Sequence, residues 1–181
     1  MSDLVRVAVD AMGGDYAPVE PVKGAVEAVN ADERVKVQLV GQVDVIEKEL
    51  QKYTYPKERV EIVPATEIIE TGEPPVNAIR HKKDSSIVVG MKKVRCGEAD
   101  AFVSSGSTGA VLVGGQTIVG RIKGVERPPL APLIPTKDGV SLLIDCGANV
   151  DARPSHLVQF AMMVPSIWNT LSALKIRVWE S

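Results

Sequence analysis

The stretch VAVDAMGGDYAP, residues 7–18, marks the point where an apolar run ends in a small polar turn. The alternating run stops at Asp10, and the glycine pair Gly13 and Gly14 and a second acid, Asp15, follow it. Glycines at a strand exit allow a sharp turn and a close approach of the backbone to a ligand. We therefore expect a ligand-binding turn that Asp10 or Asp15 organises. The alternative is a tight strand exit in which Asp15 caps the next segment.

Strand-like and helix-like patterns alternate along the rest of the chain. Strands are expected at residues 4–10, 35–40, 59–63, 101–104, 130–135 and 140–145, and helices at 21–30, 43–52, 76–83, 85–95, from about 107, and at 154–163. This alternation predicts an α/β fold with a doubly wound, mostly parallel sheet. Ligands of such sheets bind beyond the carboxyl ends of the strands. The turns at 10–15, 104–109 and 145–149 are therefore expected to gather at one edge.

The segment SSGSTGA, residues 104–110, has the composition of an anion-binding turn. Gly106 allows a turn after the strand, and Ser107 or Thr108 can cap a helix whose first free amides attract an anion. We expect an anion of phosphate size to bind at this turn, which contains Ser104, Gly106, Ser107, Thr108 and Gly109. An ordinary helix cap without a ligand is the alternative.

Two other stretches hold weaker candidates. In DCGANVD, residues 145–151, Asn149 offers a donor and an acceptor, although a plain Asx turn is the better interpretation of this stretch alone. Arg80 could turn its guanidinium toward a phosphate. A basic patch for an acidic partner is also conceivable, but a solvated face is the favoured interpretation of its residues, Arg80, Lys83, Lys92, Lys93 and Arg95.

Composition limits which classes of protein and which kinds of site fit this sequence. The 181 residues are 45% hydrophobic and 24% charged with a net charge of −2, which suits a globular domain and argues against a nucleic-acid binder. The two cysteines form no CxxC pair and His81 and His156 lack ligand spacing, so no metal site is predicted. A Cys146/His156 dyad for acyl transfer is disfavoured, because cysteine is more often a small buried hydrophobe. A reducing, cytoplasmic setting is expected.

The turns contain neither a G-x-G-x-x-G fingerprint nor a Walker loop, so the sequence predicts no dinucleotide, no ATP and no other cofactor. A nicotinamide-dependent dehydrogenase is accordingly a weak alternative.

Taken together, five stretches resemble the PlsX family of bacterial phosphate acyltransferases. They cover the chain from about Val5 to Met163 and read VAVDAMGGDYAP, IRHKKDSS, SSGSTGA, VGRIKGVERPPLAPLIPT and LLIDCGANVDARPSHLVQFAMM. The resemblance implies a fold related to phosphotransacetylases and isocitrate-type dehydrogenases. It also implies an enzyme of fatty acid and phospholipid synthesis that converts acyl-[acyl carrier protein] and phosphate to acyl phosphate and free carrier protein.

The resemblance carries further expectations about sites and partners. Asn149, Ser107 and Thr108 are the expected catalytic residues, with Asn149 polarising the carbonyl or binding phosphate. Asp10 and Asp15 are expected to organise the phosphate loop. A homodimer and a peripheral membrane contact through the family's C-terminal half are implied, and no nucleic acid.

Past Met163 the resemblance stops. We interpret residues 1–163 as the N-terminal part of a PlsX-like domain and residues 164–181, VPSIWNTLSALKIRVWES, as an unrelated tail. Back-translation of the tail with chosen synonymous codons, one added G and a shifted frame gives GSIYMEHVIGIKNPRVGI, a family-like segment. A one-base deletion is therefore expected, and the alternative is a divergent C-terminal helix. The chain as it stands is expected to be inactive, as a truncated remnant or a carrier-protein-binding module.

Overall fold

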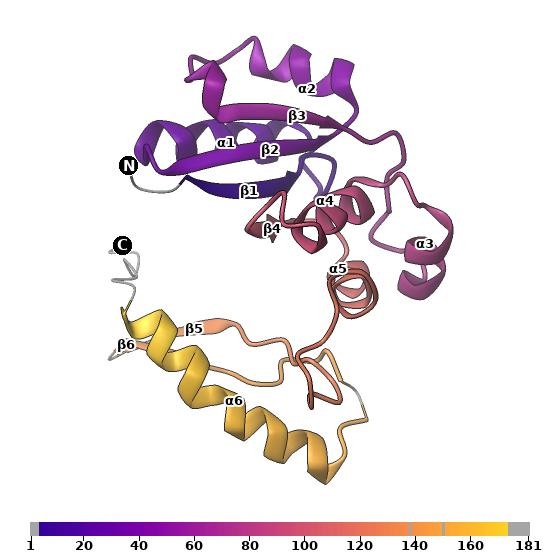
Figure 1. The fold of residues 1–181 in the computed structure, drawn as a ribbon, viewed down its shortest axis with the longest axis vertical. Coiled ribbons are helices and arrows are strands. Elements are labelled where there is room, and N and C mark those ends of the chain that lie inside the picture. Colours follow the sequence, from indigo (N-terminus) through magenta and orange to yellow (C-terminus); the bar gives the residue numbers. More distant parts are fainter. Residues whose placement is uncertain (1–3, 138, 150, 174–181) are drawn as a thin grey trace. The chain divides into compact units, whose positions relative to one another are not determined.

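The computed structural model describes residues 4–137, 139–149 and 151–173. The chain divides into two compact units, Met1–Gly120 and Arg121–Ser181, and each is described by itself (Figure 1).

A four-stranded parallel sheet with strand order β3-β2-β1-β4 forms the centre of the first unit. The strands are β1 (Val5–Asp10), β2 (Val35–Gly41), β3 (Val60–Pro64) and β4 (Ala101–Val103). The connections contain α1 (Val19–Ala31), α2 (Val43–Leu50), η1 (Lys57–Arg59), α3 (Pro75–His81) and α4 (Ser86–Arg95), and α5 (Thr108–Gly114) and the π-helical turn η2 (Gly115–Val119) follow β4. The predicted α/β fold with its parallel sheet is confirmed.

Apolar residues on both faces of the sheet hold the helices in place. On β2, Val37 and Leu39 join the cluster formed with α1 and α2, while Val40 joins Ala8 in a second cluster. A third cluster packs α3, α4 and α5 together through residues such as Ile79, Ile87 and Ala110. Residues 37–41 of β2 are all buried, as in a strand that is covered on both faces, although the polar residues Lys36 and Gln38 interrupt its apolar sequence.

The sheet order brings two of the predicted turns together. β1 and β4 are parallel neighbours, with Val9 opposite Val103. The turns that follow Asp10 and Val103 therefore leave the same edge of the sheet from adjacent strands. The expected meeting of residues 10–15 with residues 104–109 is confirmed.

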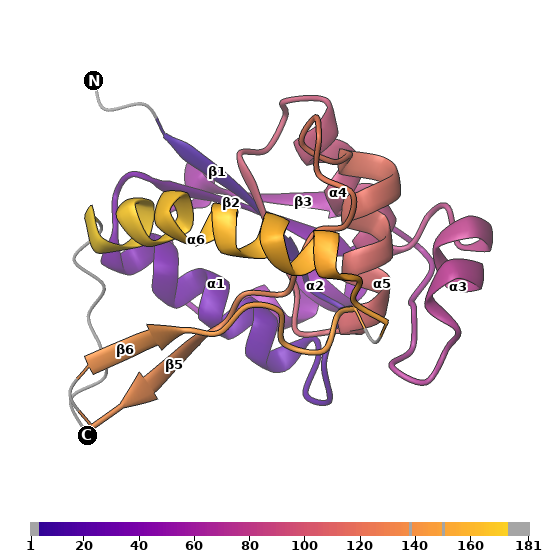
Figure 2. The same ribbon diagram turned by 90° about the horizontal axis from the view of Figure 1, so that it is seen from below.

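The second unit corrects one expectation. The strands expected at 130–135 and 140–145 are β5 (Leu133–Thr136) and β6 (Gly139–Leu142), and they pair antiparallel in a separate two-stranded sheet (Figure 2). Only two residues separate them, and a connection of that length permits a hairpin but not a parallel pair. Asp145 thus lies beyond a hairpin strand rather than at the end of a parallel one.

Helix α6 (Pro154–Ala173) begins where the sequence predicts and continues into the proposed tail. Pro165 lies inside it and cannot donate the backbone hydrogen bond that an interior helical residue makes. Residues 174–181 of the tail lie outside the described residues. Among the residues that the structure describes, no helix combines the length and the apolarity needed to cross a membrane.

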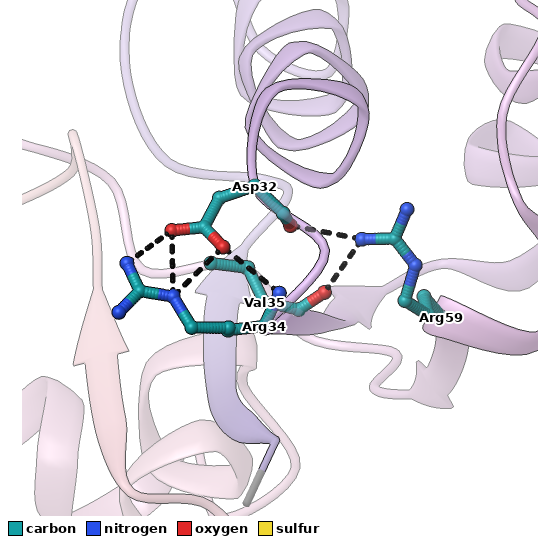
Figure 3. A network of polar contacts seen from close by, with 4 residues as sticks. All are labelled: Asp32, Arg34, Val35 and Arg59. Carbon is teal, nitrogen blue, oxygen red and sulfur yellow. Dashed lines mark hydrogen bonds and ion pairs between the residues drawn. The ribbon is translucent and has the colours of Figure 1, made fainter. Parts of the chain in front are cut away.

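A polar network stabilises the turn between α1 and β2, at the amino end of the strand (Figure 3). The Arg34 guanidinium donates to Asp32 Oδ2 at 2.6 Å, and the Arg34 amide donates to Asp32 Oδ1 at 2.9 Å. Arg59 Nη1 donates to the carbonyl of Asp32 at 2.9 Å and to that of Val35 at 3.3 Å. The hydrogen bonds from Arg34 lower the pKa of Asp32 to about 2.

Asp32 should therefore make part of the protein's stability sensitive to acid. Its folded pKa lies below the unfolded one, so its contribution is present above the unfolded pKa and is lost as pH falls from about 4 to about 2. We expect Asp32→Asn to lower the urea midpoint at pH 7 and to flatten its decline between pH 5 and pH 3. Glu47→Gln, on the exposed side of α2, is the control. Equal pH slopes for the two variants would exclude this role of Asp32.

Candidate active site

Asp10 joins the two turns at the carboxyl edge of the sheet. Its side chain is 1% exposed. Oδ1 accepts a hydrogen bond from the amide of Met12 at 3.1 Å, and Oδ2 accepts one from Ser104 Oγ at 2.7 Å. Because Ser104 follows β4, this second bond links segments 94 residues apart. Asp10 therefore links the two turns from a buried position, and its predicted role in binding a ligand stays a prediction.

The hydroxyl group of Ser104 makes two hydrogen bonds within the same pair of turns. Its hydroxyl proton goes to Asp10, while its oxygen accepts the amide of Gly106 at 3.0 Å. A phosphate needs donors, and the only donor of this side chain is already used. The structure thus makes Ser104 a link between the turns, and its predicted contact with phosphate stays a prediction.

Gly13 allows the two turns to come this close. A Cβ added at Gly13 would lie 2.3 Å from Asp10 Oδ2 and 2.9 Å from the amide nitrogen of Gly106. Gly14 has a φ of +100°, a conformation that side chains strongly disfavour. Both glycines are therefore required by the turn itself.

The start of α5 supplies free donors beside this junction. Ser107 is the N-cap, and its Oγ accepts the amide of Ala110 at 3.3 Å. The amides of Thr108 and Gly109 lie before the first intrahelical hydrogen bond and have no acceptor inside the helix. The hydroxyl protons of Ser107 and Thr108 are also uncommitted among the described contacts. The predicted helix start is confirmed, and it presents backbone and hydroxyl donors together.

Pro75 flanks this helix start, and the sequence analysis missed it. A Cβ added at Gly109 would lie 2.6 Å from Pro75 Cγ, so the first turns of α3 and α5 are packed tightly. Proline in a first helical turn signals the start of α3, but nothing in its spacing signals a contact 34 residues away. Arg80, on the same helix, and Asp15 are exposed and make no described hydrogen bond, so their roles stay predictions.

Asn149 belongs to the second unit, where its own loop holds it. The backbone amide of Asn149 donates to Asp145 Oδ2 at 2.8 Å. Its side-chain Nδ2 donates to Pro128 O at 3.2 Å and to Asp145 Oδ2 at 3.3 Å. Both side-chain donors are thus used locally, and polarising a carbonyl would require the amide to turn. The catalytic role of Asn149 and the meeting of its loop with the other two stay predictions.

Both ring nitrogens of His156 contact groups other than Cys146. Nδ1 accepts the amide of Arg153 at 3.1 Å, and Nε2 lies 3.1 Å from Glu126 Oε2. Neither contact activates a thiol, and neither supports the disfavoured Cys146/His156 dyad. Within the described residues, no group of three or more His, Cys, Asp or Glu is arranged to hold a metal ion.

A shallow groove of about 340 Å³ opens at the same sheet edge, beyond the ends of β2 and β3. Val43, Val45, Pro64 and Ala65 form most of its apolar lining. It adjoins the first turn, because the Met12 side chain packs against Gly41 at its rim.

The family is decided by a comparison with known protein families. Residues 5–172 match the model of the fatty acid synthesis protein family. The chain belongs to this family. The match covers both turns of the candidate site, residues 10–15 and 104–109.

Curated relatives include phosphate acyltransferases from two bacteria. The one from Clostridium beijerinckii is 51% identical over 159 residues, which is 88% of this chain and 48% of that protein. The one from Alkaliphilus oremlandii is 50% identical over 160 residues, 88% of this chain and 47% of the relative. The chain thus spans about half the length of the curated relatives it matches.

Among solved structures, a phosphotransacetylase from Streptococcus pyogenes has a similar fold. The TM-score is 0.64 at 18% sequence identity, over 87% of this chain and 51% of the other. The expected relationship to the phosphotransacetylase fold is confirmed.

Proposed function

We propose that this chain carries the phosphate-binding part of a phosphate acyltransferase that converts acyl-[acyl carrier protein] and phosphate to acyl phosphate and free carrier protein. The convergence of the turns after β1 and β4, fixed by the hydrogen bond between Asp10 and Ser104, carries the proposal. It places the first amides of α5 at the sheet edge where ligands of this fold class bind. The names of the half-matched relatives supply the reaction class.

The proposed reaction requires few catalytic groups from the protein. An oxygen of HPO₄²⁻ attacks the thioester carbonyl, a C–O bond forms and the C–S bond breaks. The proton of the phosphate ends on the thiol of the carrier protein, so the step balances without a cofactor. Holding the phosphate in line and stabilising the oxyanion are the main contributions. Ser107, Thr108 and Gly109 are assigned to the phosphate, and Asn149 to the carbonyl once its amide turns.

The partners and setting follow from the same proposal. We assign acyl carrier protein and inorganic phosphate as substrates, a homodimer as the assembly, and the cytoplasm as the location. Membrane contact belongs to the part of the relatives that this chain does not match.

The phosphate assignment predicts that Ser107→Ala/Thr108→Ala weakens phosphate binding about tenfold or more. The double change removes two hydroxyl donors from the site and leaves the amides in place. Phosphate affinity of the 181-residue chain, measured by calorimetry, is the readout.

The matched control is Ser85→Ala. Ser85 is the N-cap of α4; its Oγ accepts the amide of Val88 at 3.4 Å and donates to Lys82 O at 2.9 Å. Losing this cap costs about 1 kcal/mol or more, at least as much as losing the Ser107 cap, but touches no proposed ligand. Equal phosphate affinities for the double variant and the wild type would refute the assignment.

We also propose that residues 164–181 are read in a shifted frame. The recovered segment GSIYMEHVIGIKNPRVGI and the proline inside α6 support this. Resequencing the gene across the codon of Met163 should reveal one missing base, and the frame-restored protein should form acyl phosphate only when phosphate is present. An intact frame that stops after Ser181 would end the idea.

A further inference from the structure

The cations of the first unit differ in what they contact. In its described part, several lysines and arginines lie within 4.0 Å of a carboxylate oxygen: Arg6, Lys23, Arg34, Lys36, Lys52, Lys82 and Lys93. Seven others in that part make no such contact: Lys48 on α2, Lys57 and Arg59 on η1, and, on α3, on α4 and between them, Arg80, Lys83, Lys92 and Arg95. Arg80, Lys83, Lys92 and Arg95 are all exposed. We call these four residues the α3–α4 basic stripe.

Backbone carbonyls hold three of these side chains. Lys83 Nζ donates to Ile79 O at 3.2 Å, and Lys92 Nζ donates to Lys83 O at 3.2 Å. Arg95 Nη1 donates to Ile118 O at 2.8 Å and to Val119 O at 3.3 Å. A carbonyl orients a cation without cancelling its charge. The stripe is therefore a partly ordered row of positive charge, in contrast to Lys93, which Glu98 neutralises at 2.6 Å.

The surrounding sequence reinforces this charge. Residues 78–97 contain six Lys or Arg and one Asp, whereas the whole chain has 21 Lys or Arg and 23 Asp or Glu. The single acid, Asp84, accepts hydrogen bonds from the amide and the hydroxyl of Thr66, at 2.9 and 2.6 Å. These bonds, with a smaller contribution from Lys92, hold the pKa of Asp84 below its usual range. One carboxylate directed toward Thr66 leaves the stripe positive.

Helix α3 connects the stripe to the proposed phosphate loop. Pro75, in the first turn of α3, packs against Gly109, and Arg80 lies in the last turn of the same helix. A macromolecule bound along the stripe would therefore be separated from the donors of Thr108 and Gly109 by the length of this seven-residue helix. The apolar side of α4 is buried through Ile87, Val88 and Met91, so this helix has no free apolar face to insert into a bilayer.

We propose that the α3–α4 basic stripe docks an acidic protein surface that presents a row of carboxylates, and that this partner is the carrier protein that delivers the acyl group. The inference rests on the proposed function for the identity of the partner. Complementary charge of this kind speeds association and fixes orientation, and salt screens it.

The test compares two charge reversals in the 181-residue chain. Lys83→Glu/Lys92→Glu alters the stripe, and Lys48→Glu/Lys57→Glu makes the same change in net charge at exposed lysines of α2 and η1. Fluorescence anisotropy with labelled acyl carrier protein measures affinity at 50 and 300 mM salt. We expect the stripe variant to bind at least tenfold more weakly at low salt and the control less than twofold. A third variant, Lys83→Gln/Lys92→Gln, should lie between them, and circular dichroism checks that all three fold.

Each outcome decides the proposal. Equal losses of affinity in both charge-reversed variants would mean that net charge alone matters and would overturn the proposal. Wild-type affinity in the stripe variant, or no binding by the wild type, would also overturn it. Stripe-dependent binding to anionic phosphatidylglycerol vesicles, without binding to the carrier protein, would also overturn it and assign the surface to a membrane. Acyl-phosphate formation is measured separately, with the frame-restored protein. Its absence there, alongside stripe-dependent binding, would refute the proposed function and leave the docking surface intact.

Discussion

Replacing Gly13 by alanine is expected to force apart the two turns of the site and to weaken phosphate binding about 100-fold or more. The new Cβ would stand 2.3 Å from Asp10 Oδ2 and 2.9 Å from the amide nitrogen of Gly106. Neither neighbour can yield easily, because the carboxylate is bonded through both oxygens and the other atom is backbone. Overpacking of this kind costs about 1–3 kcal/mol of stability.

Gly24→Ala is the control for this change. Gly24 lies in α1, and a Cβ added there meets nothing within 4 Å. Alanine in place of a helical glycine should stabilise the chain by about 0.5–1 kcal/mol. Phosphate calorimetry and urea unfolding on both variants give the comparison. A Gly13→Ala protein with normal stability and phosphate affinity would show that the turns do not need this close approach.

Removing the carboxylate of Asp10 is expected to have the largest effect on stability. Asp10→Ala leaves the amide of Met12 and the hydroxyl of Ser104 without their buried acceptor, and each unsatisfied group costs about 1–3 kcal/mol. We expect a loss of about 2–4 kcal/mol, measured by urea unfolding, and a loss of phosphate binding with it.

Two milder changes separate this explanation from a general loss of charge. Asp10→Asn keeps an oxygen for Met12 and offers Ser104 a donor instead of an acceptor, so it should cost less than Asp10→Ala. Asp15→Ala removes an exposed carboxylate without a described partner and should change stability by less than about 0.5 kcal/mol. Similar losses for Asp10→Ala and Asp15→Ala would contradict the role given to Asp10.

The parallel sheet and the first two turns of the site could be predicted from the sequence. The apolar runs that form β1 and β2 and the helical spacing between them specify βαβ units, and β1 and β4 then place Asp10 and Ser104 at one edge. That their side chains form a hydrogen bond could not be predicted, because spacing along the chain carries no information on a contact between residues 94 apart. The same holds for Gly109 and Pro75.

The prediction failed at the hairpin of the second unit. A short apolar run suits a parallel strand and a hairpin strand equally. The overlooked signal was that only residues 136–139 separate the two expected strands, which is too short for a parallel crossover. The roles of the individual side chains within the turns could not be predicted from the sequence either. The four hydroxyl side chains of SSGSTGA look alike in the sequence, yet Ser104 donates to Asp10, Ser107 caps α5 and the Thr108 hydroxyl has no described partner.

The central claim is that the turns after β1 and β4 form one phosphate site. Amide chemical shifts of the isotope-labelled chain, followed during a phosphate titration at constant ionic strength with chloride as the balancing anion, test it most directly. The account predicts saturable shifts with one common affinity at Gly13, Gly106, Thr108 and Gly109. Shifts that fail to saturate at these residues, or that saturate only elsewhere in the chain, would contradict it.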